Sequence, residues 1–226
     1  MTDSAATLIS RVAPLGVVYA EALDIGQPLP LHPDEEAYVA NAADSRRRDF
    51  ASGRFCARAA LSRLGLPDVV IAREADGRPV WPDGIVGSIT HTAGYAAALV
   101  ARKREYLGIG VDAERVGKLT DDLIPLLFGA QEQAWLATLN PERRSLAATS
   151  LFSAKEAYFK AWSPLTGNPL SFQALHVEMD DEGFAVAQPG AMLEAWKRPI
   201  RGRLAVRADL VVTAVCLQYP FPERGG

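Results

Sequence analysis

The chain has 226 residues, of which 49% are apolar and 23% charged, and its 24 basic and 27 acidic side chains give a net charge of −3. This is the composition of an ordinary globular protein, and it excludes an intrinsically disordered chain. Duplex nucleic acid and anionic membranes attract strongly basic proteins, so the slightly acidic balance argues against both as main partners.

No stretch approaches the roughly 18 apolar residues that a transmembrane helix requires. The N-terminal residues have neither a basic start nor a long apolar run, so we expect a cytoplasmic protein. Cys56 and Cys216 are far apart and lack metal-ligand spacing. The sequence therefore indicates neither a disulfide framework nor a zinc site.

The hydrophobic pattern of the first half predicts several short strands and one long helix. In chain order, it predicts a strand at 15–23, a turn at 26–35, a helix at 34–64, a hairpin-like pair of strands at 69–84, two strands around a turn at 87–101, and a strand at 107–116.

The second half is predicted to be helical at first and then β-rich. Residues 120–163 form at least two helical segments broken near Pro141, and the last helix ends at Trp162, before Ser163-Pro164. From 172 onward the pattern alternates like antiparallel strands, with turns at 182–183 and 189–190. Each half mixes helix with sheet and no low-complexity linker separates them, which favours two closely packed lobes.

Arginines are concentrated between residues 44 and 65, where only Asp44 and Asp49 oppose them. On a helix, Arg47, Arg54 and Arg58 lie on one stripe. Such a stripe is either a solvated helix face or an anion site, because guanidinium groups bind phosphate in a bidentate manner.

Asp112 and Glu114 lie two residues apart on a predicted strand, so their carboxylates share one face. A divalent cation such as Mg²⁺ relieves the repulsion of such a pair, whereas the alternative is a solvated strand end with Arg115 as ion-pair partner. The same stretch contains Gly-x-Gly-x-x-Ala. We reject a dinucleotide site there, because the strand continues where that motif needs a tight turn.

The predicted helix around residues 151–162 places Lys155 in the middle of an apolar arc. A lysine there must either extend along its stem to solvent or meet an anion. Glu156 lies at the rim of the arc, with Lys160 one turn further on, and the two also form an ordinary (i, i+4) surface pair.

Ser88, Thr90 and His91 present two hydroxyl groups and an imidazole in one short segment, and all three can donate to a phosphate. A nucleophilic serine is disfavoured, since the segment lacks a Gly-x-Ser-x-Gly elbow. His91 is equally compatible with a structural histidine.

Together these motifs resemble the 4′-phosphopantetheinyl transferases. The match consists of Gly110-Val-Asp112-Ala-Glu114 for the family's Gly-x-Asp-x-Glu strand, Phe152-Ser-Ala-Lys155-Glu156-Ala157 with Lys160 for its Trp/Phe-x-x-Lys-Glu-Ala helix, and Ser88-Ile89-Thr90-His91 for its Ser-x-Ser-His loop. It spans residues 44–166 and is most similar to the bacterial branch that activates siderophore synthetases, as in enterobactin synthetase component D. The segment Phe128–Glu132 matches only loosely, so Glu132 is given no catalytic role.

The resemblance implies transfer of the phosphopantetheine arm of coenzyme A to a serine of an apo acyl or peptidyl carrier protein, with Mg²⁺ (or Mn²⁺) as cofactor and 3′,5′-ADP released. It implies that Asp112, Glu114, Glu156 and the Ala113 backbone hold the metal, that Glu156 acts as general base, and that Lys155 neutralises the departing phosphate. The implied coenzyme A contacts are Arg46 or Arg47, Arg54, Arg73, Ser88, Thr90, His91, Lys155 and Lys160.

The implied fold is α+β, with two pseudo-symmetric lobes at 1–105 and 106–226 and the active site between them. We expect a monomer with no nucleic-acid or membrane partner. Two alternatives remain at this point: a Mg²⁺-dependent hydrolase of coenzyme A or a nucleotide diphosphate, and a non-catalytic coenzyme A-binding or carrier-binding module.

Overall fold

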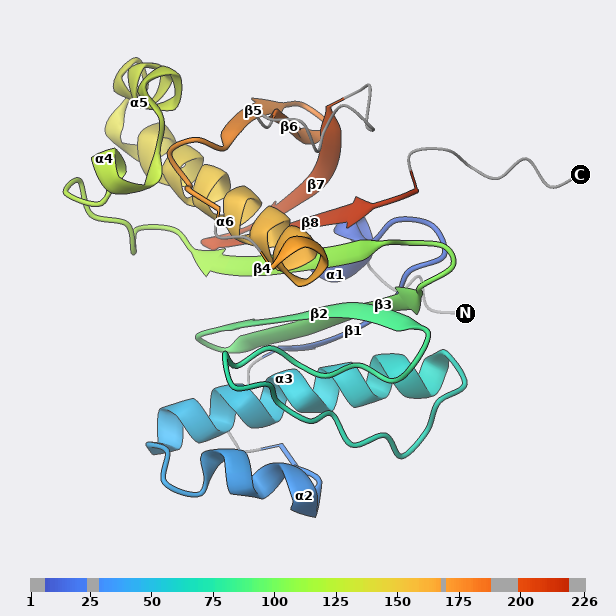
Figure 1. Cartoon of the computed structure of the whole chain (residues 1–226). Helices are drawn as coiled ribbons and strands as arrows, with labels where there is room; N and C mark the ends of the chain where they lie inside the picture. Colours follow the sequence, from blue (N-terminus) through green and yellow to red (C-terminus); the bar gives the residue numbers. More distant parts are fainter. Residues whose placement is uncertain (1–6, 24–28, 168–169, 188–198, 220–226) are drawn as a thin grey trace, which may run out of the picture.

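A computed structural model describes residues 7–23, 29–167, 170–187 and 199–219 (Figure 1). Its elements are α1 (Leu8–Val12), β1 (Val18–Leu23), α2 (Pro33–Glu36), the 3₁₀ helix η1 (Ala37–Val39), α3 (Asp44–Arg63), β2 (Ile85–Thr92), β3 (Tyr95–Arg102), β4 (Gly108–Arg115), α4 (Ile124–Leu127), α5 (Ala130–Ala137), α6 (Pro141–Thr166), β5 (His176–Asp180), β6 (Gly183–Ala187), β7 (Ile200–Arg207) and β8 (Leu210–Leu217).

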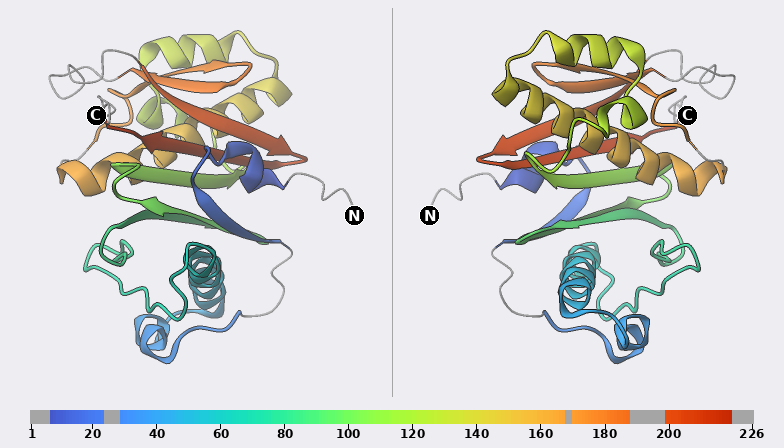
Figure 2. Two further views of the ribbon diagram at one scale, coloured as in Figure 1. Left: turned by 90° about the vertical axis from the view of Figure 1, so that its right-hand side faces the viewer. Right: turned by 90° about the vertical axis from the view of Figure 1, so that its left-hand side faces the viewer.

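The strands form two antiparallel sheets. The first has the order β1-β3-β2 and the second the order β4-β8-β7-β6-β5. Each sheet carries one long helix, α3 on the first and α6 on the second, and β2 lies against β4 where the two sheets meet (Figure 1). Figure 2 shows the same layers from two sides. Helices packed on antiparallel sheets confirm the predicted α+β class.

Strand β3 is buried on both faces because it lies between two apolar layers. Tyr95, Ala97, Leu99 and Ala101 pack in the cluster that includes α1, β4 and β8, whereas the alternate residues Ala96, Ala98 and Val100 pack with α3. This period of two is that of a strand with both faces covered. The continuous apolar run of β3 therefore joins the two sheets into one body.

Helix α6 lies unusually close to β4 because two glycines face it. A Cβ at Gly110 would lie 1.7 Å from the carbonyl oxygen of Ala157, and one at Gly108 would lie 2.4 Å from that of Ala161. The Gly-x-Gly spacing thus serves helix–strand packing. Strand β4 runs on through Glu114, which agrees with the rejection of a dinucleotide-binding turn.

The strands predicted at 87–101 and 107–116, the strand within 15–23 and the turn after Asp180 are all present. The helical region at 34–64 is divided into α2, η1 and α3. Residues 69–84 form only a single bridge between Arg73 and Pro79, since Pro79 and Pro82 lack the N–H groups that a strand ladder needs. The turn predicted at 189–190 lies outside the described residues.

One short helix and the end of one long helix differ from the prediction. Helix α1 was not predicted, because five residues are too few to show a helical period. Helix α6 continues past Trp162 to Thr166 with Pro164 inside it, and it ends only at Gly167, whose φ of 64° is the usual left-handed stop. No helix among the described residues is long and apolar enough to cross a membrane.

Candidate active site

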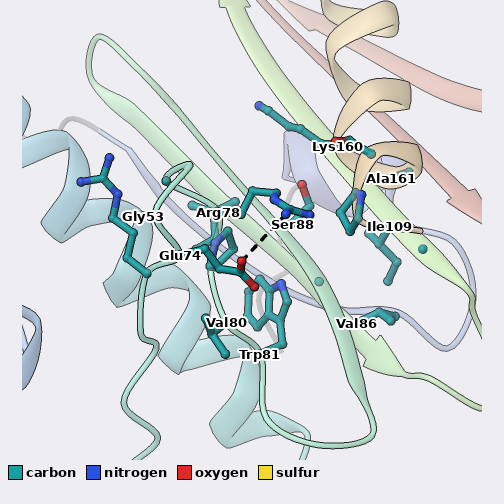
Figure 3. A pocket seen from close by; sticks show the side chains of 18 of the residues that line it. Gly53, Glu74, Arg78, Val80, Trp81, Val86, Ser88, Ile109, Lys160 and Ala161 are labelled. Carbon is teal, nitrogen blue, oxygen red and sulfur yellow. Dashed lines mark ion pairs between the residues drawn. The ribbon is translucent and has the colours of Figure 1, made fainter. Parts of the chain in front are cut away.

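A cavity of about 640 Å³ opens between α3, the segment after it, β2 and the C-terminal half of α6 (Figure 3). Its lining includes two acidic residues, Glu74 and Asp76, and six residues with permanent positive charge: Arg46, Arg54, Arg73, Arg78, Lys103 and Lys160. Arg78 is paired with Asp76 at 2.6 Å and lies 3.9 Å from Glu74. The remaining cations leave an excess of positive charge that suits a phosphate-bearing ligand.

Arg54 is the most deeply buried of these cations. Only 4% of it is exposed, its guanidinium lies 4.7 Å from the ring centre of Phe50, and Nη2 donates to the carbonyl of Ala72 at 3.3 Å. Burial lowers its pKa to about 10, so it remains protonated at neutral pH. Its buried Nε has no hydrogen-bond partner among the described residues, which leaves it able to donate to an anion.

Arg46 and Arg47, either of which could contact the ligand phosphate according to the sequence, differ in their position relative to the cavity. Arg46 lines the cavity together with Arg54 and Arg73, whereas Arg47 is absent from the lining. All four lining arginines, Arg78 included, come from α3 or from the segment that follows it.

Two hydroxyl groups on β2, those of Ser88 and Thr90, bond to β4. The backbone N–H of Val111 donates to Oγ of Ser88 at 3.1 Å, and Oγ1 of Thr90 lies 3.5 Å from Oδ1 of Asp112. Ser88 and His91 line the cavity, but Thr90 does not. Burial is the main reason that the pKa of His91 is lowered, and Asp49, 3.9 Å away, opposes it.

Two carboxylates of β4, Asp112 and Glu114, and one of α6, Glu156, influence one another electrostatically across the packed elements. Asp112 is buried, its Oδ1 accepts from Nζ of Lys160 at 2.7 Å, and its buried Oδ2 has no partner in the described part of the chain. Burial raises the pKa values of Glu114 and Glu156, and the charge of Asp112 raises both further. The charges of the three carboxylates therefore disfavour one another's ionised forms.

The same residues can be compared with a divalent-cation site. Within the described part of the chain, no three acidic, histidine or cysteine side chains are already gathered as a ligand set. The chemistry nevertheless fits: among the described residues one buried oxygen of Asp112 has no partner, and burial, with a smaller contribution from the charge of Asp112, raises the pKa values of Glu114 and Glu156. Three carboxylates are the hard oxygen donors that Mg²⁺ prefers, so Asp112, Glu114 and Glu156 suit it.

Lys155 lies outside this site. Its side chain is fully buried, and Nζ donates to Oε2 of Glu132 at 2.6 Å and to the carbonyls of Phe172 and Leu127 at 2.6 and 3.1 Å. Lys155, in the apolar arc, is thus paired with the carboxylate of Glu132, which is one of the two arrangements expected from the sequence. These three hydrogen bonds engage all three ammonium protons, so the geometry lends no support to the role at the departing phosphate that the resemblance implied for Lys155, and that role stays a prediction.

Lys160 is the lysine of α6 that faces the cavity. It lines the cavity and also donates to the carbonyl of Val111 at 3.2 Å, beside its ion pair with Asp112. Sequence reasoning missed Lys118, whose Nζ donates to Thr92 at 3.1 Å and whose charge opposes the rise in the pKa of Glu114 that burial causes. It also gave no role to the lining residues Trp81, Lys103 and Phe159.

Two family models match the chain in succession. The 4′-phosphopantetheinyl transferase N-terminal domain matches residues 34–101, and the 4′-phosphopantetheinyl transferase superfamily matches residues 108–213. The second match contains β4 and α6, which carry the three carboxylates and Lys160.

Curated relatives agree with these matches. The 4′-phosphopantetheinyl transferase Npt of Nocardia iowensis is 41% identical over 175 residues, covering 77% of this chain and 78% of that protein. The 4′-phosphopantetheinyl transferase PptT of Mycobacterium tuberculosis is 35% identical over 224 residues, covering 93% and 98%. Enterobactin synthase component D of Salmonella typhi is 29% identical over 195 residues, covering 81% and 77%. The last match confirms the resemblance to the siderophore-activating branch.

Among solved structures, a holo-(acyl-carrier-protein) synthase of Bacillus anthracis in complex with CoA aligns with a TM-score of 0.42 and 22% identity. The alignment covers 50% of this chain and 97% of that one.

Proposed function

The chain belongs to the 4′-phosphopantetheinyl transferase superfamily, and from that premise we propose how its own residues carry out the reaction. It is an enzyme that transfers 4′-phosphopantetheine to apo carrier proteins. The observation that carries the residue assignment is the position of Lys160, which lines the cationic cavity and contacts the buried carboxylate of Asp112. The anion-binding cavity and the acidic site are thus adjacent.

Coenzyme A is the proposed donor, and its charged groups match the cations of the cavity. We assign its 3′-phosphate to Arg46, Arg54, Arg73 and His91, because the unpartnered Nε of Arg54 needs an acceptor and His91 lines the same cavity. Its diphosphate is assigned to Lys160, with Ser88 as a further contact. Thr90 is assigned an indirect part, since its hydroxyl faces Asp112 instead of the cavity.

The proposed metal ligands are Asp112, Glu114 and Glu156, with the backbone of Ala113 between the first two. When bound there, Mg²⁺ would supply positive charge where negative charge develops on the diphosphate. The support from this chain is the orphaned oxygen of Asp112 and the raised pKa values of its acidic neighbours.

Glu156 is the proposed general base. Attack of the carrier serine on the β-phosphate of coenzyme A forms the new P–O bond and breaks the bond to 3′,5′-ADP, while the hydroxyl proton passes to a carboxylate. Burial raises the pKa of Glu156 toward the working pH, which favours proton acceptance. Lys160, which lines the cavity, supplies positive charge to the bridging oxygen that leaves on 3′,5′-ADP.

We further propose the lobe boundary near residue 105, a cytoplasmic location and a monomeric state. The boundary is supported by the change of sheet between β3 and β4, and by the division between the two family-model matches.

The decisive experiment is intact-protein mass spectrometry of an apo carrier protein incubated with this chain, coenzyme A and Mg²⁺, beside an EDTA control. The expected result is a metal-dependent gain of one phosphopantetheine group. Release of free phosphopantetheine without any carrier would instead indicate hydrolysis. Tight binding of coenzyme A, with no transfer to several unrelated carriers and no release, would indicate a binding module.

A further inference from the structure

Lys160 and Asp112 form a contact that the proposed reaction alone does not explain. Nζ of Lys160 lies 2.7 Å from Oδ1 of Asp112, and the side chain of Asp112 is only 6% exposed. Building on the proposed metal site, we infer that Lys160 competes with the divalent cation for Asp112. The ion pair offsets the charge of Asp112 in the metal-free site and at the same time lowers the affinity of the site for the cation.

The first support is the charge balance around Asp112. Two further carboxylates, Glu114 and Glu156, are close enough for the charge of Asp112 to raise their pKa values. The described contacts give Asp112 one cationic partner, Lys160, and leave its Oδ2 unpaired. A buried carboxylate is destabilising without a countercharge. In the metal-free protein the ammonium group of Lys160 supplies the positive charge that a metal ion would otherwise supply to Asp112.

The second support is that the side chain of Lys160 has room to move away from Asp112. Its side chain is 30% exposed and lines the cavity, whereas Lys155 on the same helix is fully enclosed by Glu132 and two carbonyls. A cation that binds Asp112 repels an ammonium held at hydrogen-bond distance from the same carboxylate. The freed ammonium then enters a cavity proposed to hold phosphate groups.

The test measures binding of Mn²⁺ alone to the full chain, without coenzyme A or carrier, from the electron paramagnetic resonance signal of free Mn²⁺ at one neutral pH. Lys160→Met removes the competing charge and is expected to tighten Mn²⁺ binding about tenfold, within the usual range of couplings between two binding events. Lys160→Arg keeps a cation at the same position and is expected to stay near the wild-type affinity.

Lys118→Met is the matched control. Lys118 also lies close enough to influence Glu114, but it donates to Thr92 and not to Asp112. Removing it therefore changes the local field without removing the competitor, and we expect a much smaller change in affinity. Lys160→Gln serves as a second neutral variant, and thermal unfolding of each variant shows that it is folded.

Unchanged or weaker Mn²⁺ binding in both neutral Lys160 variants would overturn the inference, and so would equal tightening by Lys118→Met. In either case wild-type binding that is abolished by Asp112→Asn would leave the proposed metal site standing. Failure of every variant to bind Mn²⁺, including the neutral Lys160 variants, would overturn the inference and the metal assignment together.

Discussion

Nζ of Lys155 lies 2.6 Å from Oε2 of Glu132, and both side chains are almost completely buried. Glu132 also accepts from the backbone N–H groups of Gly129 and Val177, each at 2.9 Å. The pair therefore ties α6 to the start of α5 and to β5. It holds the helix by one face while an adjacent face carries Glu156 and Lys160.

Lys155→Met is expected to destabilise the fold by about 3–5 kcal/mol, because it leaves the carboxylate of Glu132 buried and unpaired. Chemical denaturation measures this loss. The double variant Lys155→Met/Glu132→Leu is expected to recover part of it, since no charge then remains buried. Normal stability of Lys155→Met with lost turnover would contradict a structural role and return Lys155 to the chemistry.

Gly110→Ala is expected to displace α6 from β4. The new methyl group would meet the carbonyl oxygen of Ala157 at 1.7 Å, and overpacking against main chain costs about 3 kcal/mol or more. Turnover is expected to fall along with the unfolding temperature, since Glu156 and Lys160 move with the helix. The control is Gly117→Ala, which meets no atom within 4 Å and bears only the strain of its φ of 91°. Equal effects of the two substitutions would refute the packing argument.

Glu156→Gln is expected to lower the rate of transfer by about 10²–10⁴-fold while coenzyme A still binds, because the amide cannot accept the serine proton. The rate is followed by the mass of the carrier protein, and coenzyme A binding by calorimetry. Near-normal turnover would remove Glu156 as the base.

Arg54→Ala is expected to weaken coenzyme A binding about tenfold to a hundredfold, the usual loss for one charge-assisted hydrogen bond. The loss should be much smaller for dephospho-coenzyme A, which lacks the 3′-phosphate. Calorimetry with both ligands makes the comparison. Equal losses would show that Arg54 acts elsewhere on the ligand or only on the fold.

His91 is expected to make coenzyme A binding depend on pH. Burial holds its pKa below the ordinary 6.5 in the free protein, so the imidazole is neutral at pH 7. A phosphate beside it favours the imidazolium and raises that pKa, so binding takes up a proton and tightens as pH falls through the interval between the two values.

The measurement for His91 is the pH dependence of coenzyme A affinity in the wild type and in His91→Gln. The 3′-phosphate itself titrates near pH 6, but this contribution is common to both proteins and cancels in the comparison. Parallel pH profiles would show that His91 does not face a phosphate.

Most secondary structure around the site could be predicted from sequence, because β2, β3, β4 and the core of α6 have clear local periods. The 69–84 segment and the end of α6 could not. Proline made the local pattern misleading in both places. Pro79 and Pro82 prevented the predicted hairpin, whereas Pro164 lies inside the last turn of α6, a helix that packing against β4 stabilises.

The residue types and spacing of two motifs determined the chemistry of this protein: a carboxylate pair on one strand, and a glutamate with two lysines on one helix. Only the tertiary structure decided which lysine serves which carboxylate. Lys155 pairs with Glu132, 23 residues earlier in the chain, and Lys160 pairs with Asp112. That choice depends on how α6 is rotated against β4, and the rotation is set by contacts between distant segments, above all the close approach of Gly108 and Gly110 to the helix.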